Sequence, residues 1–283
     1  MLPVNDLKNY IKTIFKKYNL EPNKLMGQNF LIDKQVLSNI AKASNISKND
    51  TILEIGPGLG ILTEELAKHA GSVVAVEKDR KLAKIVRSIL IDKNIRNVEI
   101  IEGDILKTTN YKLQTINYKI VANIPYYLTS HLIRGFLECE NPPKEMILMI
   151  QKEVAQRICA RPPKMSLLAV SVQFYAKPKI IEFVSKKSFW PQPKVDSAII
   201  KIIPHPSPLL IKGSEQGKFF LIVKAGFSHP RKQLINNLPI GLKIERSKIA
   251  KALKKIGLTP EQRAETLSVN EWLELAALLA NNL

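Results

Sequence analysis

Four consecutive residues, Asn123-Ile124-Pro125-Tyr126, combine a side-chain amide, a proline and an aromatic ring. The Asn123 side-chain carbonyl and the backbone carbonyl of Ile124 or Pro125 can each accept one N–H of an amine. Proline fixes its own φ and biases the residue before it toward an extended form, which holds the acceptors in place. Tyr126 offers a ring face on which a flat base can stack. These residue types suit the exocyclic amine of a nucleobase, although four residues alone are equally compatible with an ordinary turn.

The apolar run 118–122 predicts a buried strand that ends at this stretch. An earlier strand, 51–55, leads into a turn with glycines at Gly56, Gly58 and Gly60, and the helix 61–70 follows. Glycines at a strand-to-helix turn let a ligand approach the backbone closely. Glu77 stands at the tip of the next strand, 72–76, and lies 21 residues after Gly56, where an acid can accept from two ribose hydroxyls.

A third strand, 98–101, is followed by Asp104, whose carboxylate can accept from the amino group of a bound adenine. The competing interpretation of Asp104 is a solvated loop acid. The spacing G-x-G-x-G differs from the dinucleotide pattern G-x-G-x-x-G, and the sequence shows no motif for binding a second nucleotide. A glycine turn with an acid after each of the next two strands therefore favours S-adenosylmethionine as the cofactor.

Next to this cofactor, the Asn123 stretch is expected to bind the N6 amine of an adenine, so the reaction would be methyl transfer to that nitrogen. Hydrogen bonds from N6 to Asn123 and to a backbone carbonyl favour the pyramidal, more nucleophilic nitrogen. Alignment of the nitrogen with the methyl group supplies much of the remaining acceleration. A strong base is not required, because the proton leaves after charge has built up on nitrogen. No metal-ligand cluster is visible in the sequence.

The alternation of strands and helices predicts an α/β fold, a doubly wound Rossmann-like methyltransferase sheet with a small all-helical C-terminal domain. Near the N-terminus, Gln28 and Asn29 precede an apolar trio, and Asp33 is expected to cap the helix 34–43. The further predicted helices are 7–18, 82–90, 130–138, 152–159, 166–175, 215–226, 231–238, 246–256 and 270–283. The further predicted strands are 145–150, 180–184 and 195–202, the last two flanking the aromatic and proline-rich segment 189–193.

The chain has 283 residues, with 43 Lys and Arg against 25 Asp and Glu, a net charge of +18 and a pI near 9.8. This excess indicates a polyanionic partner, with nucleic acid first. The two cysteines have no metal-site spacing, which favours a reduced, cytoplasmic protein. No apolar run approaches the roughly 18 residues of a membrane span, so no membrane partner is expected. The basic N-terminal stretch lacks the apolar core of a secretory signal, and a mitochondrial presequence is only weakly supported.

The proline-rich segment 204–208 predicts a domain boundary. We expect a cofactor-binding catalytic domain over residues 1–205 and a small helical domain that binds nucleic acid over 206–283. Between Lys224 and Lys255 the sequence has nine Lys or Arg and a single acid, Glu245. This run is interpreted as a nucleic-acid grip rather than a merely solvated face.

These motifs together resemble the ribosomal RNA adenine dimethylase family, and within it the branch that modifies 16S rRNA, over nearly the whole chain. The resemblance rests on three groups of residues: Gly27-Gln28-Asn29-Phe30-Leu31, Glu54-Ile55-Gly56-Pro57-Gly58-Leu59-Gly60 and Val76-Glu77; Asn123-Ile124-Pro125-Tyr126-Tyr127, Gln151-Lys152-Glu153-Val154-Ala155 and 191–197; and Phe227-Ser228, Arg231-Lys232, Arg263-Ala264-Glu265 and Leu267-Ser268.

The resemblance implies a role for each candidate residue. Asn29 and Leu31 would border S-adenosylmethionine, and Gly56 would lie against its methionine and ribose. Glu77 would hold the ribose, and Asp104 would read the adenine of the cofactor.

On the substrate side, the resemblance implies that Asn123 touches both cofactor and target base. Phe189 would face Tyr126 across that base, next to Pro125. The implied reaction is dimethylation of N6 of two adjacent adenosines in the 3′-terminal hairpin of 16S rRNA, during small-subunit biogenesis, by a monomer.

Two departures from the family pattern bear on RNA docking. The family often has a basic pair before the final Lys of the Phe-Ser motif, whereas here Pro230 precedes Arg231-Lys232. The aromatic-glycine pair that the family usually has near Arg161 is missing. Three other functions remain open: an antibiotic-resistance type 23S rRNA adenine methylase, a DNA adenine methylase, and a ribosome-assembly factor whose main role is binding. The C-terminal motifs argue against the first, and the lack of a sequence-reading domain argues against the second. The intact Asn123 stretch and Glu77 argue that activity is retained.

Overall fold

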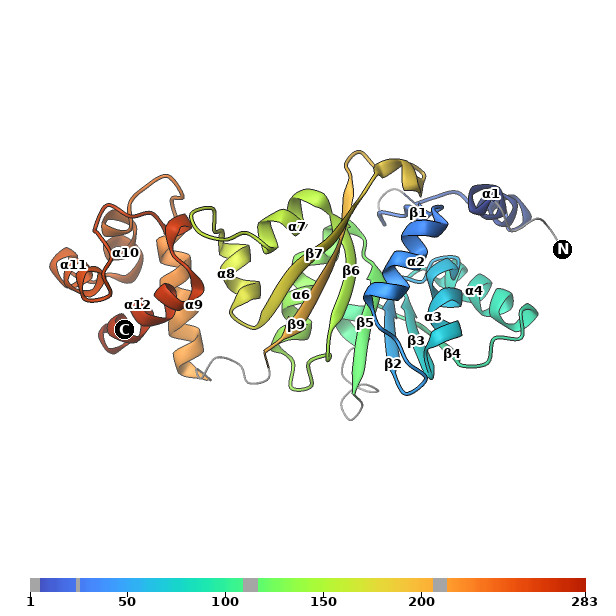
Figure 1. Cartoon of the computed structure of the whole chain (residues 1–283), viewed down its shortest axis with the longest axis horizontal. Coiled ribbons are helices and arrows are strands. Elements are labelled where there is room, and N and C mark those ends of the chain that lie inside the picture. The colour runs from blue at the N-terminus through green and yellow to red at the C-terminus, as the bar shows by residue number, and fades with distance from the viewer. Residues whose placement is uncertain (1–5, 24–25, 109–116, 206–212) are drawn as a thin grey trace. The chain divides into compact units, whose positions relative to one another are not determined.

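A computed structural model describes residues 6–23, 26–108, 117–205 and 213–283 (Figure 1). The residues fall into two compact units, 1–155 with 179–203, and 156–178 with 204–283. The second unit thus includes 156–178, which the sequence assigned to the catalytic domain. Residues 206–208 of the proline-rich segment 204–208 lie outside the described residues. The function assigned to each domain stays a prediction.

The first unit contains the sheet. Its strands are β2 (Thr51–Ile55), β3 (Ser72–Glu77), β4 (Val98–Glu102), β5 (Tyr118–Asn123), β6 (Met146–Gln151), β7 (Ala176–Val184) and β9 (Ser197–Pro204). They lie in the order β4-β3-β2-β5-β6-β9-β7, parallel from β4 to β6, with β9 antiparallel to β6. A separate two-stranded sheet pairs β1 (Phe30–Leu31) with β8 (Phe189–Trp190). The mostly parallel sheet confirms the predicted fold class.

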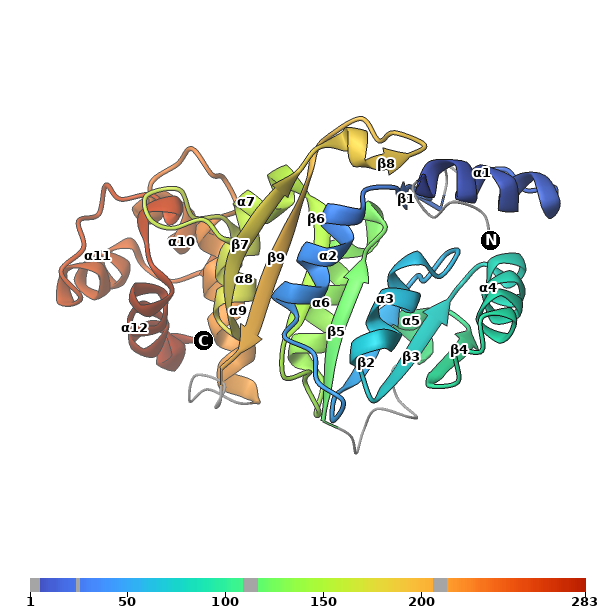
Figure 2. The ribbon, with the colours of Figure 1, turned by 45° about the vertical axis from the view of Figure 1, so that its right-hand side comes forward.

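Helices cover both faces of this sheet (Figure 2). Helices α2 (Lys34–Ala43), α3 (Ile61–His69) and α4 (Arg80–Asp92) pack on one face in continuous apolar clusters with the strands. Helix α6 (Thr129–Glu138) lies on the other face, where Phe136 meets Tyr118 of β5 edge to ring. The remaining helices of this unit are α1 (Leu7–Lys17), α5 (Ile105–Thr108), the start of α7 (Lys152–Ile158), and the short 3₁₀ turns Tyr126–Leu128 and Lys186–Ser188. As predicted, Asp33 caps α2 by accepting from two backbone N–H groups.

The second unit is built on aromatic packing. Its elements are α8 (Leu167–Gln173), α9 (Ser214–Gly226), α10 (Leu234–Leu242), α11 (Arg246–Lys255), α12 (Val269–Leu279) and the 3₁₀ turns Ala264–Thr266 and Ala280–Asn282. Phe174 stacks on Phe219 of α9 at 4.6 Å, and Trp272 of α12 is fully buried. The predicted helix 231–238 was wrong at both ends, because α10 begins at Leu234 and continues through Pro239.

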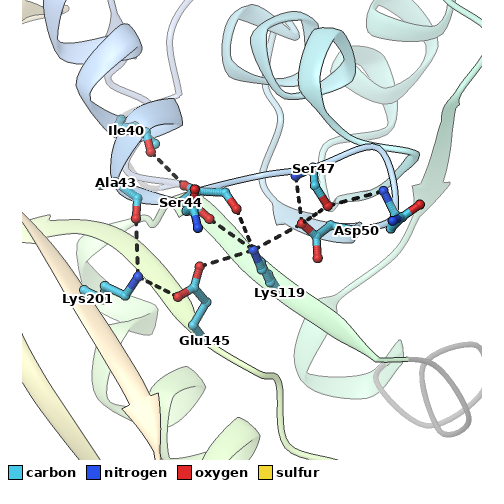
Figure 3. Close-up of polar contacts among 10 residues, drawn as sticks. Ile40, Ala43, Ser44, Ser47, Asp50, Lys119, Glu145 and Lys201 are labelled. Atoms are coloured by element: carbon cyan, nitrogen blue, oxygen red, sulfur yellow. Dashed lines mark hydrogen bonds and ion pairs between the residues drawn. The ribbon is translucent and has the colours of Figure 1, made fainter.

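A polar network lies at the amino-terminal edge of the sheet (Figure 3). Asp50, Lys119 and Glu145 stand at the starts of β2, β5 and β6, and their side chains are 12–15% exposed. Lys119 Nζ lies 3.2 Å from Asp50 Oδ2 and 3.6 Å from Glu145 Oε1. Burial opposes ionisation of Asp50, but hydrogen bonds from Ser47 and Lys119 lower its pKa below the ordinary value. The network therefore holds three adjacent strands together at this edge.

The same network fixes the end of α2. Lys119 Nζ donates to the carbonyl of Ser44, the C-cap of α2, at 3.3 Å and to that of Asn45, just beyond the helix, at 2.9 Å. The terminal carbonyls of an α-helix lack partners within the helix. Lys201 of β9 bonds Glu145 at 2.6 Å and reaches the carbonyl of Ala43. The positive charges also suit the negative end of the helix dipole. Helix α2 is thereby anchored over the sheet, and with it the segment before Asp33.

Replacing Lys119 with Met should lower the free energy of unfolding by about 2–4 kcal/mol, because two carboxylates and two carbonyls lose a shared, largely buried cation. Urea unfolding monitored by circular dichroism measures the change. The matched control is Lys68→Met, because Lys68 pairs with Glu65 at 2.7 Å but is 65% exposed; that exposed pair should contribute less than about 1 kcal/mol. Equal losses in the two variants would contradict the anchoring role of Lys119.

Candidate active site

A cleft opens at the carboxyl ends of the central strands. The chain runs outward from β2 to β3 and β4 and then returns to the other side of β2 as β5. Ligands of open α/β sheets bind where the strand order reverses in this way. The cleft holds about 1100 Å³ of empty space, including its open mouth. All nine predicted residues line it: Asn29, Leu31, Gly56, Glu77, Asp104, Asn123, Pro125, Tyr126 and Phe189.

The glycine turn forms the floor of the cleft beside β2. Gly56, Gly58 and Gly60 all have φ between 60° and 81°, a region that side chains strongly disfavour. A Cβ on Gly56 would meet no atom within 4 Å, so this backbone faces open space. Glu77, only 6% exposed, secures the turn: Oε2 accepts from the Gly58 N–H and Oε1 from the Asp79 N–H, both at 2.9 Å. Burial nevertheless raises the pKa of Glu77 above its ordinary value.

Asp104 lies after β4 with Lys78 as its ion-pair partner. The Lys78 Nζ is 2.9 Å from Asp104 Oδ2, and this hydrogen bond lowers the pKa of Asp104. Both residues line the cleft. Asp104 is therefore ionised at neutral pH and can accept from an amino group. The sequence analysis did not single out Lys78, because a lysine after a strand-end acid is usually a solvated residue.

Asn123 ends β5, and its amide is held by the opposite wall of the cleft. Its Nδ2 donates to the backbone carbonyl of Asn29 at 3.2 Å, and Asn29 Nδ2 in turn donates to the carbonyl of Gly27. A primary amide that donates through nitrogen keeps its carbonyl oxygen as an acceptor. Pro125 O already accepts from Leu128 N–H at 3.0 Å, which favours Ile124 O as the second acceptor of an amine.

The small β1–β8 sheet brings Phe189 to the cleft. Leu31 pairs with Phe189 and Phe30 with Trp190, in an antiparallel register that the sequence did not predict. Phe189 is 3% exposed and belongs to the apolar cluster under α2. It therefore forms a fixed wall of the cleft rather than a mobile ring.

Tyr126 lies in the 3₁₀ turn that follows Pro125, at the same end of the cleft. Its hydroxyl is 3.0 Å from Ser197 Oγ at the start of β9, a contact that fixes the ring. Burial raises the pKa of Tyr126, so the hydroxyl is neutral and available for this bond. Ser197 is fully buried and is a positioning residue that the sequence analysis missed.

Glu54 is a third cleft-side residue, after Lys78 and Ser197, to which the sequence assigned no role. It is 1% exposed in β2 and lines the cleft, and its Oε2 has no hydrogen-bond partner among the described residues. Burial raises the pKa of Glu54 to about 8, and the charge of Glu77 adds to the rise. The nearby Thr63 hydroxyl offsets part of this rise in the pKa of Glu54, although its position does not satisfy hydrogen-bond geometry. The signal in the sequence was a charged residue inside the otherwise apolar strand 51–55.

Comparison with known proteins decides the family. The model of the ribosomal RNA adenine dimethylase family matches residues 9–281. The chain belongs to this family. It is 43% identical over 273 residues to the ribosomal RNA small subunit methyltransferase A of Dehalococcoides mccartyi strain BAV1, covering 96% of this chain and 93% of that protein. The protein of the same name from Alkaliphilus oremlandii is 40% identical, covering 96% and 95%.

Solved structures of similar proteins agree with this family membership. A dimethyladenosine transferase from Plasmodium falciparum superposes with a TM-score of 0.76 at 28% identity, covering 89% of this chain and 98% of that one. The 23S rRNA methyltransferase ErmE superposes with a TM-score of 0.72 at 27% identity, covering 89% and 100%. The dimethylase is accordingly an enzyme, a methyltransferase with a Rossmann-like fold that acts on rRNA.

No group of three or more His, Cys, Asp or Glu side chains is placed to hold a metal ion within the described ranges. No helix in that part of the chain is long and apolar enough to cross a membrane.

The raised pKa of Glu54 predicts a pH-dependent stability difference. The folded protein keeps a proton on Glu54 up to a pKa of about 8, whereas the unfolded chain releases it near 4.5, so its contribution to stability falls as pH rises between these values. Glu54→Gln cannot ionise, so its stability should match the wild type at pH 5 and exceed it at pH 8, with a slope of at most about 1.4 kcal/mol per pH unit.

Urea unfolding at pH 5, 6.5 and 8 measures this difference. The control is Glu153→Gln, because Glu153 is exposed on α7 and should show no such trend. A difference between Glu54→Gln and wild type that does not change with pH would mean that Glu54 titrates as an ordinary carboxylate.

Proposed function

We propose that this dimethylase transfers methyl groups from S-adenosylmethionine to N6 of two adjacent adenosines in the 3′-terminal hairpin of 16S rRNA, and so acts in small-subunit biogenesis. The observation that carries the proposal is the tether of Asn123. Because its amide nitrogen is bonded to Asn29, its carbonyl oxygen is the group available at the cleft to accept from an amine. The relatives named small subunit methyltransferase A support the choice of rRNA.

The cleft suits S-adenosylmethionine on several grounds. Gly56 presents bare backbone to open space, where a ligand can lie against the chain. Glu77 has acceptor capacity beyond its two backbone bonds and would accept the ribose hydroxyls. Asp104 would accept from the adenine amine, with Lys78 holding the carboxylate in place. Glu54 offers a buried oxygen to the positively charged methionine end, and a nearby cation would favour its ionised form.

When bound, this cofactor supplies an electrophilic methyl group on a positively charged sulfur. The protein's part is to present the adenine nitrogen to that group. Asn123 Oδ1 and Ile124 O would accept the two N6 hydrogens, while Tyr126 stacks on the base and Phe189 limits its movement. These contacts would leave the nitrogen lone pair free to attack the methyl group, and holding the two reactants in place would supply much of the acceleration. After transfer, the proton on N6 passes to solvent.

The RNA side of the proposal rests on charge. All nine Lys and Arg residues between Lys224 and Lys255 are exposed, and they belong to the second compact unit. Such a surface would contact phosphates without regard to sequence. We therefore keep the assignment of subunit binding to residues 206–283 and of catalysis to 1–205, and we propose that the enzyme acts as a monomer.

The main alternative is methylation of 23S rRNA, favoured by the likeness to ErmE. Identity is higher, 43% against 27%, to relatives named for the small subunit. A ribosome-assembly factor that binds without methylating is the other alternative, and the complete set of cleft residues argues against it.

One experiment separates these functions. The protein is incubated with labelled S-adenosylmethionine and either small subunits or large subunits that lack the modification, and modified bases are mapped by primer extension. We expect stops at two adjacent adenosines of 16S rRNA. Stops only in 23S rRNA would establish the alternative enzyme, and stable binding to small subunits without label would establish an assembly factor.

Glu77→Ala should weaken binding of S-adenosylmethionine by about tenfold to a hundredfold, because hydrogen bonds to a charged acceptor contribute roughly 1.5–3 kcal/mol. Calorimetry with the folded variant measures the affinity. Glu102→Ala is the matched control, since Glu102 is the β4 residue paired in register with Glu77 but lies outside the cleft, bonded to Arg80. Unchanged affinity in Glu77→Ala would remove Glu77 from the cofactor site.

Tyr126→Ala should slow methyl transfer while leaving cofactor affinity near normal, because base–aromatic stacking contributes about 1–3 kcal/mol per base. Tyr126→Phe keeps the ring and loses only the bond to Ser197, so it should be mild and should match Ser197→Ala. Single-turnover methylation of small subunits, with cofactor affinity and thermal melts alongside, tests this order. A Tyr126→Ala enzyme that melts normally and methylates at the wild-type rate would exclude stacking.

A further inference from the structure

The outer face of the edge strand β7 is unusual for a basic protein. Phe183 is 51% exposed and Ile181 is 40% exposed, although both stand on a strand of the main sheet. Side chains of a strand alternate between faces, so these two share one face with Lys179. The opposite face points toward α2, because Glu182 accepts from Asn39 of that helix. Two apolar side chains and a lysine are thus left open on the α6 face of the sheet.

A lysine covers the exposed ring. Lys152 Nζ, from the first residue of α7, lies 5.2 Å from the centroid of Phe183, within cation–π range. Lys179 and Lys187 are exposed nearby in the chain, and Lys186 is half-buried. We name Lys152, Lys179, Ile181 and Phe183 the β7 strip. An aromatic ring with ammonium groups around it offers both stacking for a base and charge for a phosphate.

The β7 strip is joined to the target-base end of the cleft by direct contacts. The Lys152 N–H donates to the carbonyl of Asp196 at 3.0 Å, and Gln151 pairs in register with Ser197. Ser197 in turn contacts the Tyr126 hydroxyl. Lys152, which covers Phe183, thus directly follows Gln151, the residue paired with the Ser197 that contacts Tyr126.

We propose that the β7 strip binds unpaired RNA that flanks the target adenosine, with a base stacked on Phe183 and phosphates at Lys152 and Lys179. The occupant follows from charge, because a face with two lysines on a protein of net charge +18 favours a polyanion over another basic surface. An aromatic ring under a cation favours a nucleobase over an aliphatic partner. The proposal rests on the proposed function, since it deepens how that enzyme holds its RNA.

Three variants at Phe183 test the proposal in the full-length protein. Phe183→Ala should raise the KM for small subunits by about fivefold to a hundredfold, with kcat at saturating subunit and affinity for S-adenosylmethionine unchanged. Phe183→Tyr keeps a ring and should restore the wild-type KM, whereas Phe183→Leu keeps only apolar surface and should not. Ile91→Ala, which removes a still more exposed apolar side chain on α4 (76% against 51% for Phe183), is the control and should change nothing.

Charge is tested separately by binding to protein-free 16S rRNA over a salt series. Lys152→Gln with Lys179→Gln should reduce the log–log salt slope by roughly 0.7 to 0.9 for each lost phosphate contact. Lys84→Gln, an exposed lysine of α4, should leave the slope unchanged.

Three results would overturn the proposal that the β7 strip binds RNA. If Phe183→Leu binds as well as wild type, the contact is apolar and the partner is a protein. If the variants weaken binding to subunits but not to protein-free rRNA, a ribosomal protein covers the strip. Failure of the proposed function is distinguishable: wild-type enzyme would then leave 16S rRNA unmethylated, whereas failure of the strip alone leaves methylation and KM normal in Phe183→Ala.

Discussion

The hydrogen bond from Asn123 Nδ2 to the carbonyl of Asn29 joins the two halves of the cleft. It connects the end of β5 to the segment before β1, residues 94 positions apart, and it fixes which atom of the amide faces a ligand. Contacts around Asn29 hold its carbonyl in position for this hydrogen bond. The β1–β8 pairing holds the strand after Asn29, Asp33 caps α2 just beyond it, and Ser188 Oγ bonds the same Asp33 at 2.9 Å. An acceptor aimed at an amine depends on all of these.

Charge is divided between the inside of the cleft and the outside of the molecule. The cleft has the acids Glu54, Glu77 and Asp104, whereas the chain as a whole has a net charge of +18. A positively charged cofactor suits the first environment and RNA the second. Because buried acids resist ionisation without a cation, Glu54 and Glu77 have raised pKa values, and a cationic ligand would relieve that cost. In the proposed function, the acidic cleft would therefore favour the cationic cofactor, and the basic exterior would favour RNA.

The carboxyl and amino ends of the parallel strands have different roles: the first forms the cleft, and the second stabilises the sheet. At the carboxyl edge, the buried acid Glu54 has an oxygen with no hydrogen-bond partner among the described residues, a feature that costs stability. At the amino edge, Lys119 with Asp50 and Glu145 forms a network in which each charge has a partner (Figure 3). The second edge stabilises the strands and α2, which keeps the first edge in shape for a ligand.

The sequence by itself determined the local features. Apolar runs and glycine turns predicted each strand of the main sheet and the cap at Asp33, because these depend on residues a few positions apart. The predicted start of the strand 180–184 was wrong, because β7 begins at Ala176. The sequence also placed all nine candidate residues in one cleft, since acids and amides at the ends of parallel strands must gather at one edge. The roles of those residues are still predictions.

Only the tertiary structure decided the contacts between distant segments. Leu31 pairs with Phe189 across 158 positions, and Ser197 meets Tyr126 across 71. Helix α10 passes through Pro239, a residue that locally ends helices, and a Cβ on its Gly241 would lie 2.6 Å from Ala225, so close packing against α9 sustains it. Burial likewise gave Glu54 its raised pKa. Such effects depend on which surfaces meet in three dimensions, and patterns among residues a few positions apart do not reveal those contacts.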